Sequence, residues 1–197
     1  MESSKTHARA QRERILDAAR QRFIEVGFHA ASVDSIAKRA GISTGLIYRY
    51  FQSKREIILA IIESQLDQSR VGLGALPPST SLVDEMIQLV TMPSDPAVMA
   101  WNAVLFSEMT AEATRDTIVS EALQKSEKAA REEFVNWLAR RNEHTKRKQS
   151  RKRILARALL MQCLTEGLII RAVRDPHLDR DIVKDMLRHV MPMVLDA

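Results

Sequence analysis

Residues 32–59 place the strongest constraint on the fold, because they read as two short helices, a tight turn between them, and the start of a longer helix. One face of each short helix is apolar: Ile36, Ala37 and Ala40 on the first, Ile47 and Phe51 on the second. Gly41 lies between them, where the chain must turn sharply and a Cβ would cost most. This arrangement is typical of a helix-turn-helix, whose second helix enters the major groove of DNA.

Capping residues and breakers predict the other helix boundaries. Ser32 and Ser43 are good N-caps for helices over about 33–40 and 44–51, and Gly27 should end a first helix over about 8–26. Ser53 with Glu56 forms a capping-box pattern for a fourth helix that should end near residue 70. After a predicted loop at 71–81, the apolar periodicity predicts five more helices: about 82–91, 97–113, 116–141, 151–173 and 179–195.

These patterns predict an all-α fold of about nine helices. Six glycines and six prolines leave few breaks in 197 residues, and no extended alternation of Val, Ile or Thr indicates a sheet. With 45% apolar residues, the chain can bury a sizeable core. We expect a three-helix, helix-turn-helix DNA-binding domain at residues 1–55 and a second helical domain at 56–197.

Charge is uneven along the chain. Residues 1–55 contain 11 Lys and Arg against 5 Asp and Glu, a net charge of +6, whereas residues 56–197 contain 19 against 20, a net of −1. The positive charge therefore coincides with the helix-turn-helix, as binding to phosphates requires.

Several classes of site are not expected. Cys163 is the single cysteine and cannot form an internal disulfide; it lies in an apolar helix, which favours a buried structural thiol. The five histidines include no i, i+4 pair, and no nucleophile–base pattern stands out, so we expect no metal, cofactor or catalytic residue. Without a secretory signal or an apolar run of roughly 18 residues, the expected compartment is the cytosol.

The N-terminal segment closely resembles the TetR/AcrR family of bacterial transcriptional regulators. The matching residues are Phe23, Gly27, Phe28, Ser32, Ile36, Ala37, Ala40, Gly41, Ile42, Ser43, Gly45, Ile47, Tyr48, Tyr50, Phe51, Ser53 and Lys54. The match covers roughly residues 10–60, and the rest of the chain is similar to the family only in length and helical character. The resemblance implies a C-terminal part that binds a ligand and forms a dimer.

Ten residues are expected to contact DNA: Ser32, Lys38, Arg39, Ser43, Thr44, Gly45, Tyr48, Arg49, Tyr50 and Lys54. Thr44, Gly45 and Arg49 are predicted to lie at or near the bases, where Arg49 could bond a guanine edge or clamp a phosphate. The family resemblance implies that the polar tips of Tyr48 and Tyr50 reach phosphates. Lys54 opens the fourth helix, whose positive end also suits a phosphate. Ser32 and Ser43 could touch phosphate or act as caps alone, and Lys38, Arg39, Arg9 and Arg12 could be backbone contacts or simply solvated.

The last two predicted helices are apolar over most of their surface. A helix that packs only against its own core needs one apolar face, so these two helices are expected to contact something else as well. The resemblance implies that they join two copies in a four-helix bundle. The predicted dimer contacts are Leu155, Leu159, Cys163, Gly167, Ile170, Ile182, Met186 and Val190. A monomer with a generous core is the alternative.

The resemblance also implies a small-molecule pocket within the fourth to eighth helices. Candidate lining residues are Met86, Leu89, Met99, Trp101, Leu105, Phe106, Glu108, Met109, Phe134, Trp137 and Met161. Met and aromatic side chains suit an apolar ligand, although side chains of these types are more often plain core. Glu108 could meet a cationic ligand or face solvent.

Taken together, the sequence predicts a homodimeric, ligand-responsive repressor that binds palindromic double-stranded operator DNA. The alternatives are an activator, a regulator without an effector, a helical enzyme with a DNA-binding head, and an architectural DNA binder. A second basic run at 140–153 could bind nucleic acid or an acidic partner, but we interpret it as a solvated loop.

Overall fold

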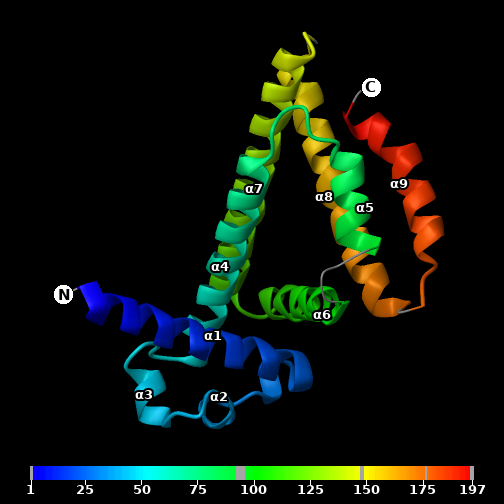
Figure 1. Cartoon of the computed structure of the whole chain (residues 1–197). Helices are drawn as coiled ribbons and strands as arrows, with labels where there is room; N and C mark the ends of the chain where they lie inside the picture. The colour runs from blue at the N-terminus through cyan, green and yellow to red at the C-terminus, as the bar shows by residue number, and fades with distance from the viewer. Residues whose placement is uncertain (1, 92–95, 147–148, 176, 196–197) are drawn as a thin grey trace. The chain divides into compact units, whose positions relative to one another are not determined.

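The structure is a computed structural model that describes residues 2–91, 96–146, 149–175 and 177–195. For residues 2–5, 65–75, 88–91, 96–102 and 172 it describes the backbone alone. Within those residues the chain forms nine helices and no strand, which confirms the all-α fold. The helices are α1 (Glu2–Ala30), α2 (Val33–Ala40), α3 (Thr44–Tyr48), α4 (Lys54–Ala75), α5 (Leu82–Thr91), α6 (Pro96–Ala113), α7 (Thr117–His144), α8 (Arg151–Arg174) and α9 (Arg180–Leu195) (Figure 1).

The observed boundaries agree with most of the predicted ones, and two differences have physical causes. Helix α4 continues to Ala75, so the loop predicted from residue 71 was wrong over its first five residues. Glycines inside a helix cost only about 1 kcal/mol each and do not stop it, whereas Pro77 removes a backbone donor and restricts the residue before it. Helix α3 ends at Tyr48 rather than at residue 51, because the following residues form tighter turns, in which the Arg49 amide bonds the Leu46 carbonyl at 3.2 Å and the Tyr50 amide bonds the Ile47 carbonyl at 2.9 Å.

Gly27 marks a break in direction inside α1. Its backbone has φ 78° and ψ 163°, a conformation that only glycine adopts readily, so the predicted stop coincides with a kink before the last turn of the helix. The Ala31 amide then bonds the Gly27 carbonyl at 3.2 Å.

The chain divides into two compact units. Unit 1 comprises Met1–Gln65 and Val104–Ser126, and unit 2 comprises Leu66–Ala103 and Glu127–Ala197. Unit 1 is therefore larger than the domain predicted at residues 1–55, because it also takes in the first half of α4, the end of α6 and the start of α7. Helices α4, α6 and α7 each contribute residues to both units.

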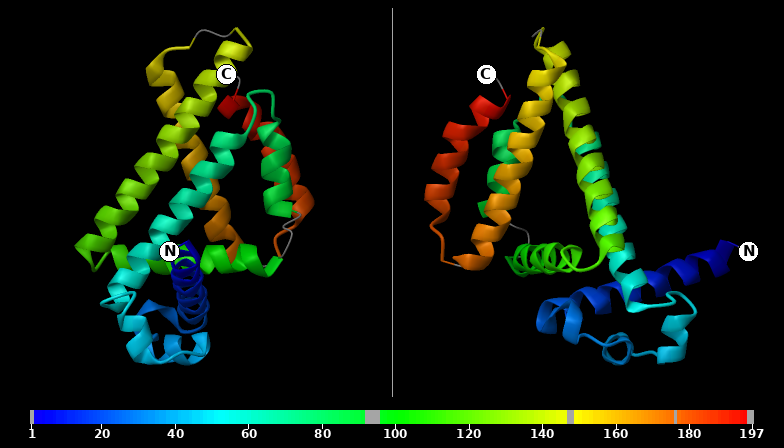
Figure 2. Two further views of the ribbon diagram at one scale, coloured as in Figure 1. Left: turned by 60° about the vertical axis from the view of Figure 1, so that its left-hand side comes forward. Right: turned by 180° about the vertical axis from the view of Figure 1, so that it is seen from behind.

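The core of unit 1 forms where α2 and α3 pack on the same side of α1, as Figures 1 and 2 show from three directions. Phe23 and Phe28 meet edge to face with ring centroids 4.5 Å apart. The core also contains Ile15, Ile36, Ile47, Ile57 and Ile61, all fully buried. Residues from later helices complete it: Leu105, Met109 and Val119.

Unit 2 has a core of its own, in which α5 lies beside α9 and α9 beside α8. Phe134 and Trp137 stack with centroids 6.0 Å apart, and Leu187 and Met191 of α9 are fully buried. Pro192 is accommodated one turn before the end of α9, where it has little helix left to disturb. Among the described residues, none of the helices has the length and apolar character needed to cross a bilayer.

Candidate nucleic-acid interface

The turn between α2 and α3 is built by local caps. The Ser32 hydroxyl accepts from the Ser35 amide at 3.1 Å, and the Ser32 amide donates to the Ser35 hydroxyl at 3.2 Å, which closes a capping box at the start of α2. Gly41 adopts the left-handed conformation (φ 63°, ψ 38°) that ends the helix. The Ile42 amide then reaches back to the Ala37 carbonyl at 3.1 Å. The predicted turn glycine therefore has the backbone geometry expected of it.

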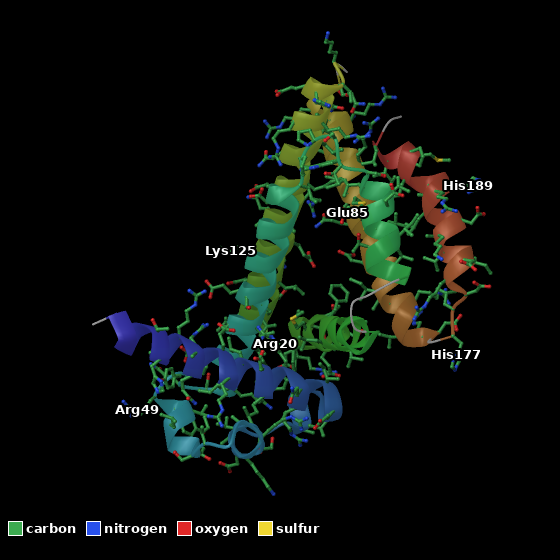
Figure 3. All side chains as sticks on the ribbon, viewed as in Figure 1. Arg20, Arg49, Glu85, Lys125, His177 and His189 are labelled. Atoms are coloured by element: carbon green, nitrogen blue, oxygen red, sulfur yellow. The ribbon has the colours of Figure 1, made fainter. Side chains whose placement is uncertain are left out.

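Helix α3 presents an open outer side. Ser43 caps it by accepting from the Leu46 amide at 3.2 Å, and Ile47 is fully buried, which fixes the rotation of the helix. On the opposite side, Gly45 and Arg49 are exposed, as Arg49 shows in Figure 3, and Tyr48 is 52% exposed. A Cβ added to Gly45 would have no described atom within 4 Å, apart from its sequence neighbours and the backbone of its own helix. This side of α3 can approach another molecule closely.

The two tyrosines have different environments. Tyr48 is exposed, whereas Tyr50 is half-buried and packs against the core of unit 1. The surface needed for the predicted phosphate contact is therefore more exposed on Tyr48 than on Tyr50. Sequence spacing could not separate them, because the helix ends at Tyr48 and the chain turns between the two residues.

Lys54 holds the end of α1. Its ammonium group donates to the carbonyls of Phe28 at 2.6 Å, His29 at 3.1 Å and Ala31 at 3.0 Å. The last carbonyls of a helix have no partner within the helix, and here one lysine bonds two of them together with the carbonyl of Ala31, the residue that follows α1. Since an ammonium group has three donors, a contact between Lys54 and a phosphate would have to replace one of these bonds.

Glu108 stabilises the same segment from α6. Its Oε2 atom accepts a hydrogen bond from the Phe28 amide at 2.8 Å, and a Cβ on Gly27 would approach that oxygen to 3.0 Å. The sequence predicted that Glu108 would meet a cationic ligand or face solvent, whereas in the structure it accepts a hydrogen bond from the backbone of Phe28. A ligand that engaged this carboxylate would compete with the Phe28 amide.

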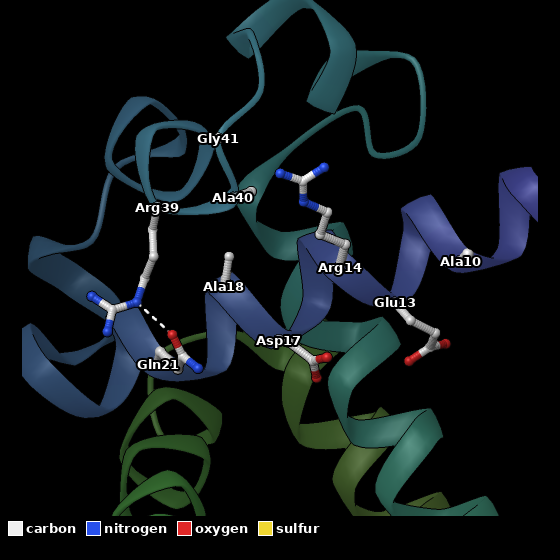
Figure 4. A pocket seen from close by; sticks show the side chains of 9 residues that line it. All are labelled: Ala10, Glu13, Arg14, Asp17, Ala18, Gln21, Arg39, Ala40 and Gly41. Carbon is white, nitrogen blue, oxygen red and sulfur yellow. Dashed lines mark hydrogen bonds between the residues drawn. The ribbon is translucent and has the colours of Figure 1, made fainter.

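Arg39 is bound to α1 by two side chains. Its Nε donates to the Gln21 side chain at 2.6 Å, and its guanidinium pairs with both oxygens of Glu25 at 2.7 and 3.0 Å. Figure 4 shows the Arg39–Gln21 bond at one side of a groove of about 470 Å³ between α1 and α2. Lys38 is exposed, and Arg12 lies over the Phe51 ring at 5.2 Å, in a cation–π contact. Of the predicted backbone contacts, Lys38 is thus more accessible than Arg39.

Arg55 in the first turn of α4 forms an ion pair with Asp116, the residue before α7. Arg55 Nε lies 2.5 Å from Asp116 Oδ2, and Asp116 Oδ1 accepts from the amides of Ile118 at 2.9 Å and Val119 at 3.3 Å. Desolvation raises the pKa of Asp116, but the hydrogen bonds from Arg55 and the two amides outweigh it and lower the pKa overall. Sequence reasoning missed Arg55, Asp116 and Glu25, because nothing in local spacing predicts which distant carboxylate a given arginine will meet.

The predicted ligand-binding residues are divided between the two cores. Leu105 and Met109 belong to the core of unit 1, whereas Met86, Phe134, Trp137 and Met161 belong to the core of unit 2. Phe106 is half-buried, and the side chains of Leu89, Met99 and Trp101 lie outside the described residues. The predicted pocket therefore stays a prediction.

Five of the eight predicted dimer residues are exposed on α8 and α9 of unit 2. Leu159 is 51% exposed and Ile182 is 64% exposed, and Leu155, Cys163 and Gly167 are exposed as well. Ile170, Met186 and Val190 are half-buried. The prediction that Cys163 is a buried thiol was wrong for the single chain, because Cys163 lies on the outward side of α8.

The family model "Bacterial regulatory proteins, tetR family" matches residues 15–61, which span most of α1 through the first part of α4. The transcriptional regulator UidR of Escherichia coli strain K12 is 33% identical over 135 residues, covering 68% of this chain and 67% of UidR. The solved structure of Salmonella enterica GusR superposes with a TM-score of 0.75 at 25% identity, over 95% of this chain and 96% of GusR. A regulator from Saccharomonospora viridis in complex with choline has a TM-score of 0.72 over 91% of this chain and 94% of its own, and at 16% identity it shows the shared fold alone.

Proposed function

The chain belongs to the TetR family of bacterial regulatory proteins and is a transcriptional regulator, and on that premise we propose that it is a homodimeric repressor released from palindromic operator DNA by a small molecule. One observation is central to the DNA-binding part. Ile47 is buried, so Gly45, Tyr48 and Arg49 lie on the open side of α3. This is the side that a recognition helix turns toward base edges.

The contacts divide by the chemistry of the side chains. Thr44, Gly45 and Arg49 face the bases, where Gly45 lets the backbone approach the floor of the groove. Tyr48 and Lys38 bond phosphates, which position the protein without reading sequence. Lys54 contributes chiefly by holding the last carbonyls of α1 in place. The net charge of +6 on residues 1–55 attracts the DNA backbone.

Two copies join through α8 and α9. Large apolar side chains exposed on one surface of a monomer mark an interaction site, and here they belong to two neighbouring helices: Leu155, Leu159, Leu160, Val173, Ile182 and Met193. A two-fold dimer presents two copies of α3 to half-sites that lie about 34–36 Å apart, or a multiple of that distance.

The proposed effector is a small, largely apolar molecule, neutral or cationic. A protein of the same fold is described in complex with choline, which supports a fold able to accommodate a small cation. In this chain Glu108 is the carboxylate proposed to meet a cation, and doing so would draw it from the Phe28 amide. As a separate proposal confined to unit 2, Met86, Phe134, Trp137 and Met161 are candidate apolar contacts for an effector.

Release follows from a shift in population. In one arrangement of the dimer the spacing of the two recognition helices does not match the spacing of the half-sites. An effector that binds this arrangement better raises its population and so lowers operator affinity. By reciprocity, operator DNA weakens effector binding by the same factor. Equal effector affinity with and without operator would contradict this mechanism.

The test is selection of bound sequences from a random duplex library by the full-length protein, followed by footprinting on the selected site. We expect a palindrome whose binding survives excess random DNA. Tyr48→Ala should lower affinity for it by about tenfold with an unchanged salt dependence, because the side chain is neutral, whereas Lys38→Ala should reduce the salt dependence by about one phosphate contact; neither should change the melting temperature. Selection of no sequence would refute operator recognition.

In vitro transcription from a promoter containing the selected site then tests the sign of regulation. A repressor lowers transcript yield, and the yield recovers when an effector is added. A rise in transcript on addition of the protein alone would instead identify an activator.

A further inference from the structure

Asp34 stands out in the segment that faces DNA. It is the only acidic residue between positions 28 and 53, a stretch that otherwise carries Lys38, Arg39 and Arg49. It lies exposed in the first turn of α2. A carboxylate beside the phosphates of a duplex weakens binding to DNA of any sequence, so its presence here needs a compensating contact.

That carboxylate is bonded to the recognition helix. The hydroxyl of Thr44, the first residue of α3, donates to Oδ1 of Asp34 at 2.8 Å. A threonine hydroxyl has one proton, and Asp34 accepts it, so only the lone pairs of the Thr44 oxygen remain to bond another molecule. An ionised carboxylate also has lone pairs and no proton. The pair therefore presents acceptors and no donor.

The neighbouring residues leave this pair accessible. The Ser43 oxygen accepts from the Leu46 amide as the cap of α3, and Gly45 has no side chain, with open space where its Cβ would stand. Thr44 itself is half-buried, which limits the directions in which its oxygen can accept.

We propose that Asp34 and Thr44 together determine one base of each operator half-site, by accepting a hydrogen bond from the exocyclic amino group of cytosine or adenine. The inference rests on the proposed binding of α3 in the major groove. There, cytosine N4 and adenine N6 are the donors, whereas guanine O6 and N7 and thymine O4 are acceptors. An acceptor placed opposite the pair is repelled, and this repulsion excludes the wrong base.

Asp34 thus trades affinity for discrimination. Removing its charge should tighten binding to random DNA while it weakens the preference at one base pair. Lys38 and Tyr48, the proposed phosphate contacts, act in the opposite sense, because they attract any duplex.

The test compares wild-type protein with Thr44→Val and Asp34→Asn, using the selected palindrome and every single-base-pair variant of one half-site. Wild type should prefer cytosine or adenine at one position by about tenfold. Thr44→Val keeps the shape and a methyl group but loses the oxygen, so the preference at that position alone should fall to within about twofold. In Asp34→Asn the amide can donate to Thr44, which frees the hydroxyl proton, and the same position should shift toward guanine or thymine.

Base analogues identify the group that is read. Replacing the preferred adenine with purine, or the preferred cytosine with a pyrimidinone that lacks the 4-amino group, should weaken binding by wild type and leave Thr44→Val unaffected. Thr44→Ser keeps the oxygen and should keep the preference. Thr110→Val, which removes an exposed hydroxyl bonded to the Phe106 carbonyl on α6, is the matched control and should select the wild-type site.

The results separate the two levels of the proposal. If wild type selects a palindrome and Thr44→Val keeps every base preference, the Asp34–Thr44 assignment is wrong, and a methyl contact with thymine explains any remaining preference. If wild type selects nothing, operator recognition fails and this assignment fails with it.

Discussion

The two units place their apolar side chains differently. In unit 1 most large apolar residues lie inside, with Val26 and Ile118 as exposed exceptions, and long-range polar contacts from Lys54, Glu108 and Arg55 satisfy the ends of its helices. In unit 2, α8 and α9 leave Leu159 and Ile182 at the surface. The comparison indicates that unit 1 has its own interior fixed by polar contacts, whereas unit 2 presents a surface suited to a second copy.

The largest expected effect comes from placing a charge on that surface. Leu159→Asp would put two carboxylates into a two-fold interface, which should weaken dimerisation by on the order of a hundredfold or more and abolish operator binding. Sedimentation at several concentrations measures this. The matched control is Ile118→Asp in unit 1, which is 46% exposed against 51% for Leu159 and should leave the association unchanged. Equal effects from both substitutions would remove the distinction between the units.

A substitution at the kink in α1 tests whether polar contacts stabilise the interior of unit 1. Gly27→Ala would force a positive φ on alanine and bring its Cβ to 3.0 Å from Glu108 Oε2, so we expect a loss of about 2–3 kcal/mol in the free energy of unfolding. Denaturant unfolding gives the value. Gly45→Ala is the control: with open space around it in a helix, the variant should be as stable as wild type, yet bind operator less well.

Lys54 distinguishes a structural contact from a DNA contact. Lys54→Met keeps an apolar stem but leaves the carbonyls of Phe28, His29 and Ala31 without the ammonium, so stability should fall by about 1–3 kcal/mol. Arg55→Met removes an ion pair whose arginine is exposed, and should cost about 1 kcal/mol. If Lys54→Met has an unchanged melting temperature and a shallower salt dependence of operator binding, Lys54 contacts a phosphate, as the sequence predicted.

The sequence predicted what local chemistry decides. The caps at Ser32 and Ser43 and the left-handed Gly41 follow from rules that span three or four residues, and the structure confirms them. The predicted capping box at Ser53 forms only in part, since Glu56 accepts from the Gln52 amide rather than that of Ser53. Thr44, Gly45, Tyr48 and Arg49 were predicted as DNA contacts because one helical turn determines which side faces outward.

Contacts between distant segments were not predictable in this way. Nothing near Lys54 in the sequence indicates that three carbonyls at residues 28–31 will surround it, or that Glu108 will reach the Phe28 amide 80 residues away. Likewise, Met and aromatic residues on α5 to α8 have the same pattern whether they line a pocket or fill a core. Leu105 and Phe134 belong to different cores, which only the three-dimensional structure separates.

The smallest expected effect concerns two carboxylates whose pKa values move in opposite directions. Burial, and then the nearby Glu127 carboxylate, raise the pKa of Glu166 in unit 2, against a smaller opposing effect of Arg131. Ionised Glu166 therefore destabilises the fold at neutral pH. Glu166→Gln should be slightly more stable at pH 7, by well under 1 kcal/mol because the group is partly solvated, and the difference should vanish below the ordinary glutamate pKa of about 4.3.

Asp116 in unit 1 should show the reverse. Its lowered pKa contributes stability that is present above the ordinary aspartate value and is lost as pH falls through the folded value, so Asp116→Asn should be less stable than wild type at pH 7 and approach it in acid. Thermal melts of both variants at pH 7 and near pH 3 check the pair, with Asp181→Asn as a control for a lowered pKa at an exposed helix start. If both variants change stability in the same direction at pH 7, the two carboxylates do not differ as the geometry of their units requires.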